Sequence, residues 1–238
     1  MSANAADPGI AVPAADSAAT TRALLGCAVL AGPVFAAVTL AQTAARGGGY
    51  DPKIHPLSML SLGELGWIQI ANFVLCGLLA VAGSFGIRRS LRARPAGTWG
   101  PILFAVYGIS LVWGGVFVAD PAFGYPAGTP EGAPEQLSWH GMLHGFAPAV
   151  SGVAVIVLCF VFARRYVRLG RRGWAAYCWS AVAVDLALTG ASIALGDFRY
   201  MLAGGVYVWV WTAAIAWDLL RQRSEQDEPS RTASTSGA

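Results

Sequence analysis

Six stretches of the chain are each long and apolar enough to cross a membrane. A transmembrane α-helix needs roughly 20 apolar residues to cover about 30 Å of hydrocarbon. The chain as a whole is 55% hydrophobic and 12% charged, which is too apolar for an ordinary soluble domain of 238 residues. The predicted spans are 23–45, 65–87, 99–119, 141–163, 174–195 and 201–220. The sequence therefore predicts an all-α fold, a polytopic bundle of six transmembrane helices.

Arginines gather on one side of this predicted topology. They are Arg88, Arg89, Arg92 and Arg94 after the second span, Arg164, Arg165, Arg168, Arg171 and Arg172 after the fourth, and Arg22, Arg221 and Arg223 beside the first and last spans. The opposite loops hold only Arg46, Lys53 and Arg199. The positive-inside rule then predicts a multi-pass protein of the cytoplasmic membrane with both termini in the cytoplasm. The arginine runs abut apolar spans and contain no interleaved aromatic residues, so we expect membrane lipids and no nucleic acid as partners.

The two ends of the chain differ in composition from the region between them. Residues 1–21 are rich in Ala, Asp, Pro and Ser, and residues 223–238 are polar. Such segments bury too little apolar surface to fold alone. We therefore predict disordered cytoplasmic tails at 1–21 and 223–238, and a transmembrane domain over 22–222.

Polar residues cluster in the loops that this topology places on the outer side. His140 and His144 are four residues apart and share one helix face. The other members of the cluster are His55, Glu64, Asp120 and Asp197. Imidazole and carboxylate are good ligands for zinc, and a catalytic zinc needs three protein ligands with one open position. His140, His144 and Asp120 are the candidate metal ligands, with Asp120 or Glu64 as candidate catalytic carboxylates. Capping of a helix by Ser138 and a boundary position for the histidines are the alternative interpretation.

Asp185 is the most costly side chain to place, because it falls near the middle of the fifth span. A carboxylate there must be protonated, paired or hydrated. The candidate neighbours are Gln69 and Asn72 on the second span and Thr189 and Ser192 on the fifth. Asp185 is predicted either to hold helices together by hydrogen bonds or to carry protons in a small proton-linked carrier.

Three segments carry a resemblance to a known family. They are the run from His55 to Asn72, which includes Ser61-Leu-Gly63, then Asp120-Pro121, and Ser138-Trp-His140-Gly-Met-Leu-His144. Over about residues 20–222 the chain resembles the bacterial and archaeal membrane family catalogued as domain of unknown function 998. The resemblance implies a six-span architecture and marks His140, His144, Asp120 and the Ser61-Leu-Gly63 segment as motif positions without giving them roles. The HxxxH pattern is also similar to that of the ceramidase and adiponectin-receptor hydrolases, although those have seven spans.

These observations leave three functions open. The first is a non-catalytic membrane protein whose outward-facing polar pocket binds a lipid headgroup or a partner, with the arginines contacting anionic lipid. The second is a metal-assisted hydrolase at the outer leaflet, with zinc as cofactor. The third is the proton-linked carrier that uses Asp185. A homo-oligomeric assembly is compatible with each of them.

Overall fold

The computed structural model describes the backbone of residues 14–92 and 94–235 and the side chains of 17–92 and 94–225. The elements are α1 (Ala14–Ala45), the short 3-10 helix η1 (Leu57–Ser61), α2 (Gly66–Ser90), α3 (Trp99–Val116), α4 (Trp139–Arg168), α5 (Arg172–Leu195) and α6 (Phe198–Thr235). Six of these helices are long and apolar enough to cross a membrane. The all-α, six-span prediction is therefore confirmed.

The helix ends differ from the predicted boundaries mainly at the two termini. α1 begins at Ala14, so residues 14–21 of the predicted N-terminal tail are helical. α6 continues to Thr235, well beyond the predicted end of the transmembrane domain at 222. Both extensions continue a helix that is already nucleated, and adding one more hydrogen-bonded residue costs much less than starting a new helix. Residues 1–13 and 236–238 of the predicted tails lie outside the described residues.

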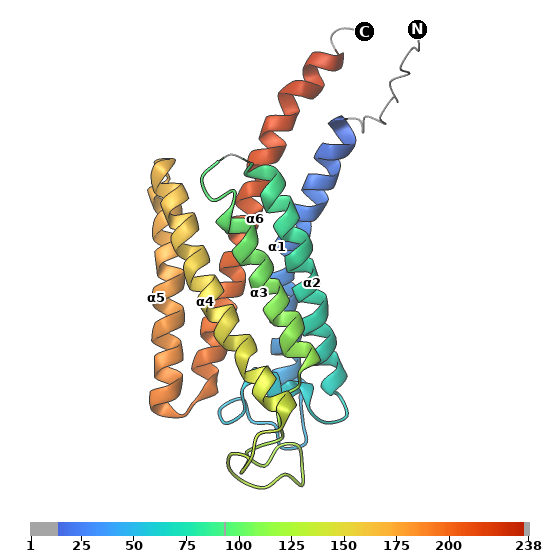
Figure 1. Ribbon diagram of the computed structural model, residues 1–238, viewed down its shortest axis with the longest axis vertical. Helices are drawn as coiled ribbons and strands as arrows, with labels where there is room; N and C mark the ends of the chain where they lie inside the picture. Colours follow the sequence, from blue (N-terminus) through green and yellow to red (C-terminus); the bar gives the residue numbers. More distant parts are fainter. Residues whose placement is uncertain (1–13, 93, 236–238) are drawn as a thin grey trace, which may run out of the picture.

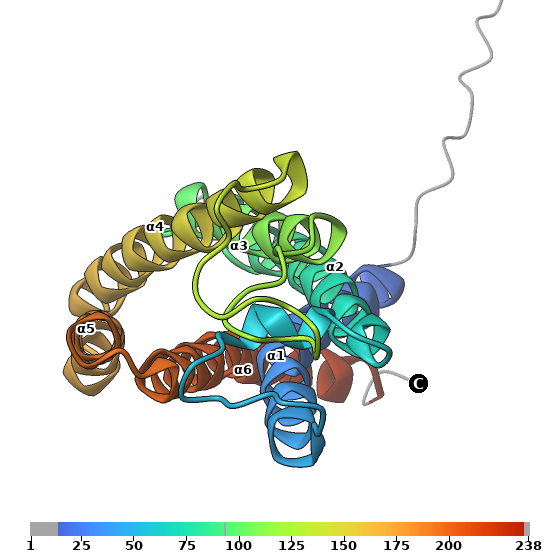
Figure 2. The same cartoon turned by 90° about the horizontal axis from the view of Figure 1, so that it is seen from below.

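The six helices run up and down and form a closed ring. Each helix packs on the next along the chain, and α6 returns to pack against α1. Figure 1 shows the helices running along the long axis, with both termini at one end. Figure 2, viewed along the bundle, shows α5 at one corner, between α4 and α6. Short connections make α2 and α3, α4 and α5, and α5 and α6 antiparallel neighbours, whereas the two long loops join α1 to α2 and α3 to α4.

The two ends of the bundle have different characters. We call the end that carries residues 46–65, 117–138 and 196–197 the loop end, and the end that carries the chain termini and residues 91–98 and 169–171 the arginine end. Trp67 and Trp139 begin helices at the loop end, and Trp99 begins one at the arginine end. All three are more than half exposed, as expected of anchors at the two membrane interfaces.

Glycines allow the closest helix contacts. A Cβ atom added to Gly77 on α2 would lie 2.6 Å from the backbone oxygen of Gly108 on α3, and one added to Gly108 would lie 2.7 Å from the backbone oxygen of Gly77. These distances are too short for a real side chain, so α2 and α3 touch through their backbones. The resulting apolar core lies between the helices and includes Phe35, Phe162 and Trp211.

Candidate functional site

Asp120 caps the start of α4. Its Oδ2 accepts a hydrogen bond from the Ser138 backbone N–H at 2.7 Å, and its Oδ1 accepts one from the Ser138 hydroxyl at 2.5 Å. The same hydroxyl oxygen accepts from the Gly141 N–H at 3.0 Å, which makes Ser138 the N-cap residue. Asp120 thus fixes the cap, and its negative charge is favourable beside the positive end of the helix dipole.

The three histidines occupy separate places at the loop end. His144 is buried, and its Nδ1 lies 2.7 Å from the backbone oxygen of Phe117 at the end of α3. His140 is exposed, and its ring lies 3.6 Å from the ring of Trp139. His55 accepts a hydrogen bond at Nδ1 from the Asp51 N–H at 2.9 Å. The three imidazoles therefore differ in their burial and in their contacts.

His55 joins the two long loops of the loop end. Because its Nδ1 is an acceptor, its Nε2 carries the proton and donates to the backbone oxygen of Phe123 at 2.9 Å. Its ring packs between Tyr50 and Tyr125, with centroid distances of 5.6 and 5.4 Å. Burial raises the pKa of Tyr50 to about 12, so its phenol stays neutral. This cluster holds the loops together and leaves the imidazole with no vacant nitrogen.

Glu64, Asp197 and Ser61 have different surroundings. Glu64 is exposed. Asp197 pairs with Arg199 at 2.6 Å, and these hydrogen bonds hold the pKa of Asp197 below its usual value. Ser61 is buried, and its hydroxyl has no hydrogen-bond partner among the described residues. Within residues 17–92 and 94–225, no three His, Cys, Asp or Glu side chains gather where they could hold a metal ion. The structure thus gives no support to the zinc interpretation of His140, His144 and Asp120.

Asp185 lies on α5 opposite a glycine of α6. A Cβ atom added to Gly204 would lie 3.4 Å from Asp185 Oδ1, which places the carboxyl against the α6 backbone. Asp185 is half-buried and makes no hydrogen bond to any residue that the structure describes. Ser192 is buried two turns further along α5, and its hydroxyl has no partner there either. The predicted contacts of Asp185 with Gln69 and Asn72 are wrong.

Gln69 and Asn72 instead belong to a polar ladder between α1 and α2. Gln42 Nε2 donates to Gln69 Oε1 at 2.6 Å, and Gln69 Nε2 donates to Thr39 Oγ1 at 3.3 Å. Asn72 Nδ2 donates to Phe35 O at 3.2 Å and lies within hydrogen-bond distance of Thr39 Oγ1 and Gln69 Oε1. These four polar side chains are buried. Because each amide both donates and accepts, the ladder satisfies polar groups that would otherwise face lipid.

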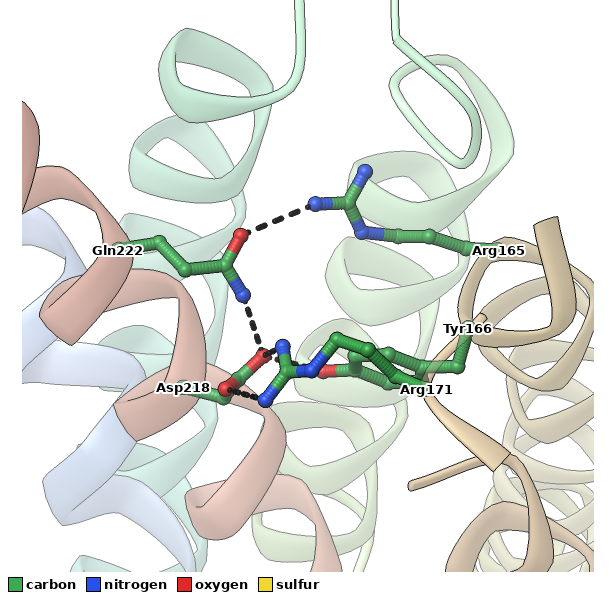
Figure 3. A network of polar contacts seen from close by, with 5 residues as sticks. All are labelled: Arg165, Tyr166, Arg171, Asp218 and Gln222. Carbon is green, nitrogen blue, oxygen red and sulfur yellow. Dashed lines mark hydrogen bonds and ion pairs between the residues drawn. The ribbon is translucent and has the colours of Figure 1, made fainter. Parts of the chain in front are cut away.

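Asp218 on α6 is the centre of a second network, at the arginine end (Figure 3). Its Oδ1 accepts from Arg171 Nη2 at 2.6 Å, and its Oδ2 accepts from Arg171 Nη1 at 2.7 Å. Oδ2 also accepts from the Tyr166 hydroxyl at 2.8 Å and from Gln222 Nε2 at 2.5 Å. The two Asp218 hydrogen bonds raise the pKa of Arg171, which also lies over the rings of Tyr166 and Trp174. The network joins α6 to the end of α4 and the start of α5.

Arg165 on α4 lies beside this network and forms no ion pair with any residue that the structure describes. It is 3% exposed, and its guanidinium donates to the backbone oxygen of Pro95 at 3.2 Å and to Gln222 Oε1 at 3.3 Å. Its Nε has no acceptor among the described residues. Asp218 is already neutralised by the two-point contact with Arg171. Arg165 is therefore a buried cation with only neutral acceptors (Figure 3).

A separate open recess lies between α1 and α6 at the arginine end. Its volume is about 440 Å³, and its lining residues are Arg22, Trp217, Leu220, Arg221, Ser224 and Glu225. Two guanidiniums face one carboxylate there, so the recess carries a net positive charge. Trp217 and Leu220 give it an apolar wall.

The arginine-end network was not predicted, because its arginines were interpreted as topology signals and as contacts for anionic lipid. One signal in the sequence pointed to it. Asp218 is an acidic residue inside the apolar run Trp217-Asp218-Leu219-Leu220, so it required a partner as much as Asp185 did.

The comparisons with known proteins agree with this architecture. The sequence model of the family described as "Protein of unknown function (DUF998)" matches residues 29–218, which run from α1 through Asp218 on α6. No curated protein and no solved structure matches the chain. The chain therefore belongs to the DUF998 family, as the segments from His55 to His144 predicted.

Proposed function

We propose that this chain is a non-catalytic integral membrane protein whose arginine end faces the cytoplasm and binds anionic phospholipid headgroups. The observation that carries the proposal is the recess between α1 and α6. Arg22 and Arg221 supply guanidiniums for a phosphate group, and Trp217 and Leu220 supply an apolar surface for the adjoining acyl chains. A phospholipid binds best where cationic donors meet its headgroup and an apolar surface near an interfacial tryptophan meets its acyl chains.

The loop end supports the non-catalytic part of the proposal. Asp120 is used in capping α4, and His144 is used in a contact with the end of α3. His55 uses both ring nitrogens to join two loops. A general base or a metal ligand needs a nitrogen or oxygen that is open to a substrate or an ion. Both oxygens of Asp120 and both nitrogens of His55 are occupied by contacts that stabilise the fold, and His144 uses its Nδ1 in the same way.

The test is lipid retention by purified full-length protein. Native mass spectrometry after incubation with equal amounts of phosphatidylglycerol and phosphatidylcholine would compare the wild type with a double variant, Arg22→Gln with Arg221→Gln. A matched control is Arg168→Gln with Arg172→Gln, which removes the same charge from exposed positions at the same end. We expect the wild type and the control to prefer phosphatidylglycerol and the recess variant to lose that preference. Equal losses in both double variants would contradict a specific site in the recess.

A proton-linked carrier is the second candidate function, and Asp185 is the observation that favours it. The carboxyl lies half-buried in a membrane span without a hydrogen-bond partner among the described residues. Such a group must take up a proton, water or a cation. Proteoliposomes that contain a pH-sensitive dye provide the test. Proton flux in the wild type that disappears in Asp185→Asn would support this function, and the same flux in both proteins would exclude a role for Asp185.

A further inference from the structure

The starting observation is the unbalanced charge of Arg165. Its guanidinium is buried, and its two hydrogen bonds go to the uncharged oxygens of Pro95 and Gln222. No carboxylate among the described residues forms an ion pair with it. Burying a cation without a counter-charge destabilises the folded state even after the surroundings relax. Binding of an anion next to such a cation therefore stabilises the folded protein.

A small cavity lies next to this cation and is surrounded by further donors. Its lining residues are Ser90, Leu91, Arg94, Leu219, Gln222 and Arg223, which come from α2, the 91–98 connection and α6. Gln222 is shared, because its Oε1 accepts from Arg165 and its Nε2 donates to Asp218. The buried hydroxyl of Ser90 has no hydrogen-bond partner among the described residues. The cavity has room for about one water molecule.

We propose that Arg165, Arg94, Arg223 and Ser90 form a binding site for a phosphate group. A phosphate presents three or more acceptor oxygens in different directions, and this site offers donors from α2, α4, α6 and the loop between α2 and α3. A single carboxylate would satisfy fewer of them. The cavity holds about one water molecule as it stands, so a phosphate group fits only when the exposed side chain of Arg94 at its rim moves outward.

The Arg171–Asp218 pair keeps the site available. If Arg171 did not neutralise Asp218, the carboxylate would be the natural partner of Arg165 and would repel an anion. The two-point contact at 2.6 and 2.7 Å instead holds Asp218 toward Arg171. Gln222 then bridges the two, with its amide oriented by Asp218 so that its oxygen faces Arg165 (Figure 3).

The phosphate group has two possible sources, and binding experiments distinguish them. Calorimetric titration of the full-length protein in detergent would use inorganic phosphate, short-chain phosphatidic acid and short-chain phosphatidylcholine as probes. Binding of inorganic phosphate as well as phosphatidic acid would identify a soluble phosphate as the ligand. Binding of phosphatidic acid alone would identify a lipid headgroup. Absence of binding by both probes would overturn the proposal.

Variants of the arginines that line the cavity test the site. Arg94→Gln and Arg223→Gln should each weaken the Kd by about tenfold or more, which is the loss expected for one hydrogen bond to a charged group. The control is Arg92→Gln, an exposed arginine on the same connection that does not line the cavity. Arg165→Lys keeps the charge but not the fork of donors, and we expect it to weaken binding as well. An affinity for phosphatidic acid that is equal in Arg94→Gln and Arg92→Gln would refute the site.

This site stands apart from the recess between α1 and α6, because the two have no lining residue in common. The Arg22 and Arg221 double variant should leave the phosphate affinity unchanged. The Arg94 variant should leave the phosphatidylglycerol preference unchanged. Each proposal can therefore fail while the other holds.

Discussion

Replacement of Asp218 by asparagine should destabilise the folded protein clearly. The change removes the negative charge of a carboxylate that accepts two hydrogen bonds from Arg171 and one each from Tyr166 and Gln222. Loss of one partner of a buried ion pair typically costs about 3–5 kcal/mol. The Arg171 side chain is 33% exposed and regains some hydration, so we expect a smaller loss, of about 2–3 kcal/mol. For a domain of this size that corresponds to a fall in Tm of about 4–12 °C.

The assay is thermal unfolding of the purified protein in detergent, with a second ion pair as its control. Asp197→Asn also breaks a carboxylate–arginine pair, but the Arg199 side chain is 62% exposed, and exposed pairs contribute little to stability. Its Tm should stay close to that of the wild type. The double variant Arg171→Gln with Asp218→Asn should be less destabilised than the sum of the single changes, because the two residues act as one unit. Equal Tm values for the Asp218 and Asp197 variants would refute the argument from burial.

Three further predictions concern helix packing, pH and topology. Gly77→Ala should lower the free energy of unfolding by about 1–3 kcal/mol, because its Cβ would meet the α3 backbone. Gly152 faces open space, so Gly152→Ala should leave the free energy of unfolding unchanged. Chemical denaturation measures both values, and equal losses in the two variants would disprove the close contact. Because the pKa of Asp197 is lowered in the folded state, its small stabilising contribution is present above the usual carboxyl pKa of about 4 and is lost as the pH falls through the lower folded value. The small difference in Tm between the wild type and Asp197→Asn at neutral pH should therefore disappear in acid, and a difference that grows in acid would contradict this sign. Green fluorescent protein fused to the C-terminus should fluoresce, and alkaline phosphatase fused to the C-terminus should be inactive, because both would lie in the cytoplasm. The reverse pattern would place the arginine end outside.

The helices could be predicted from the sequence because membrane insertion depends on length and hydropathy alone. The third span illustrates this, since it was predicted to begin at Trp99 and it does. The second span also begins within one residue of the predicted position. The extra helical turns at Ala14 and beyond residue 222 lie where hydropathy carries no signal.

The polar contacts could not be predicted in the same way, because they depend on which helices are neighbours. Asp218 and Arg171 are 47 residues apart and meet only because α6 packs on α5 beside the end of α4. Asn72 and Asp185 lie on helices that do not pack together, although their depths in the predicted spans are compatible. Position along the membrane normal is readable from sequence, whereas position around the ring is not.

The amide ladder between α1 and α2 has a consequence for how the protein is made. Gln42, Gln69 and Asn72 are costly in lipid when each span stands alone, and they become satisfied only when the two helices face each other in one register. The first two spans should therefore leave the insertion machinery together, as a preformed hairpin. Biogenesis of the whole bundle would then begin with this hairpin, on which α3 and later α6 assemble.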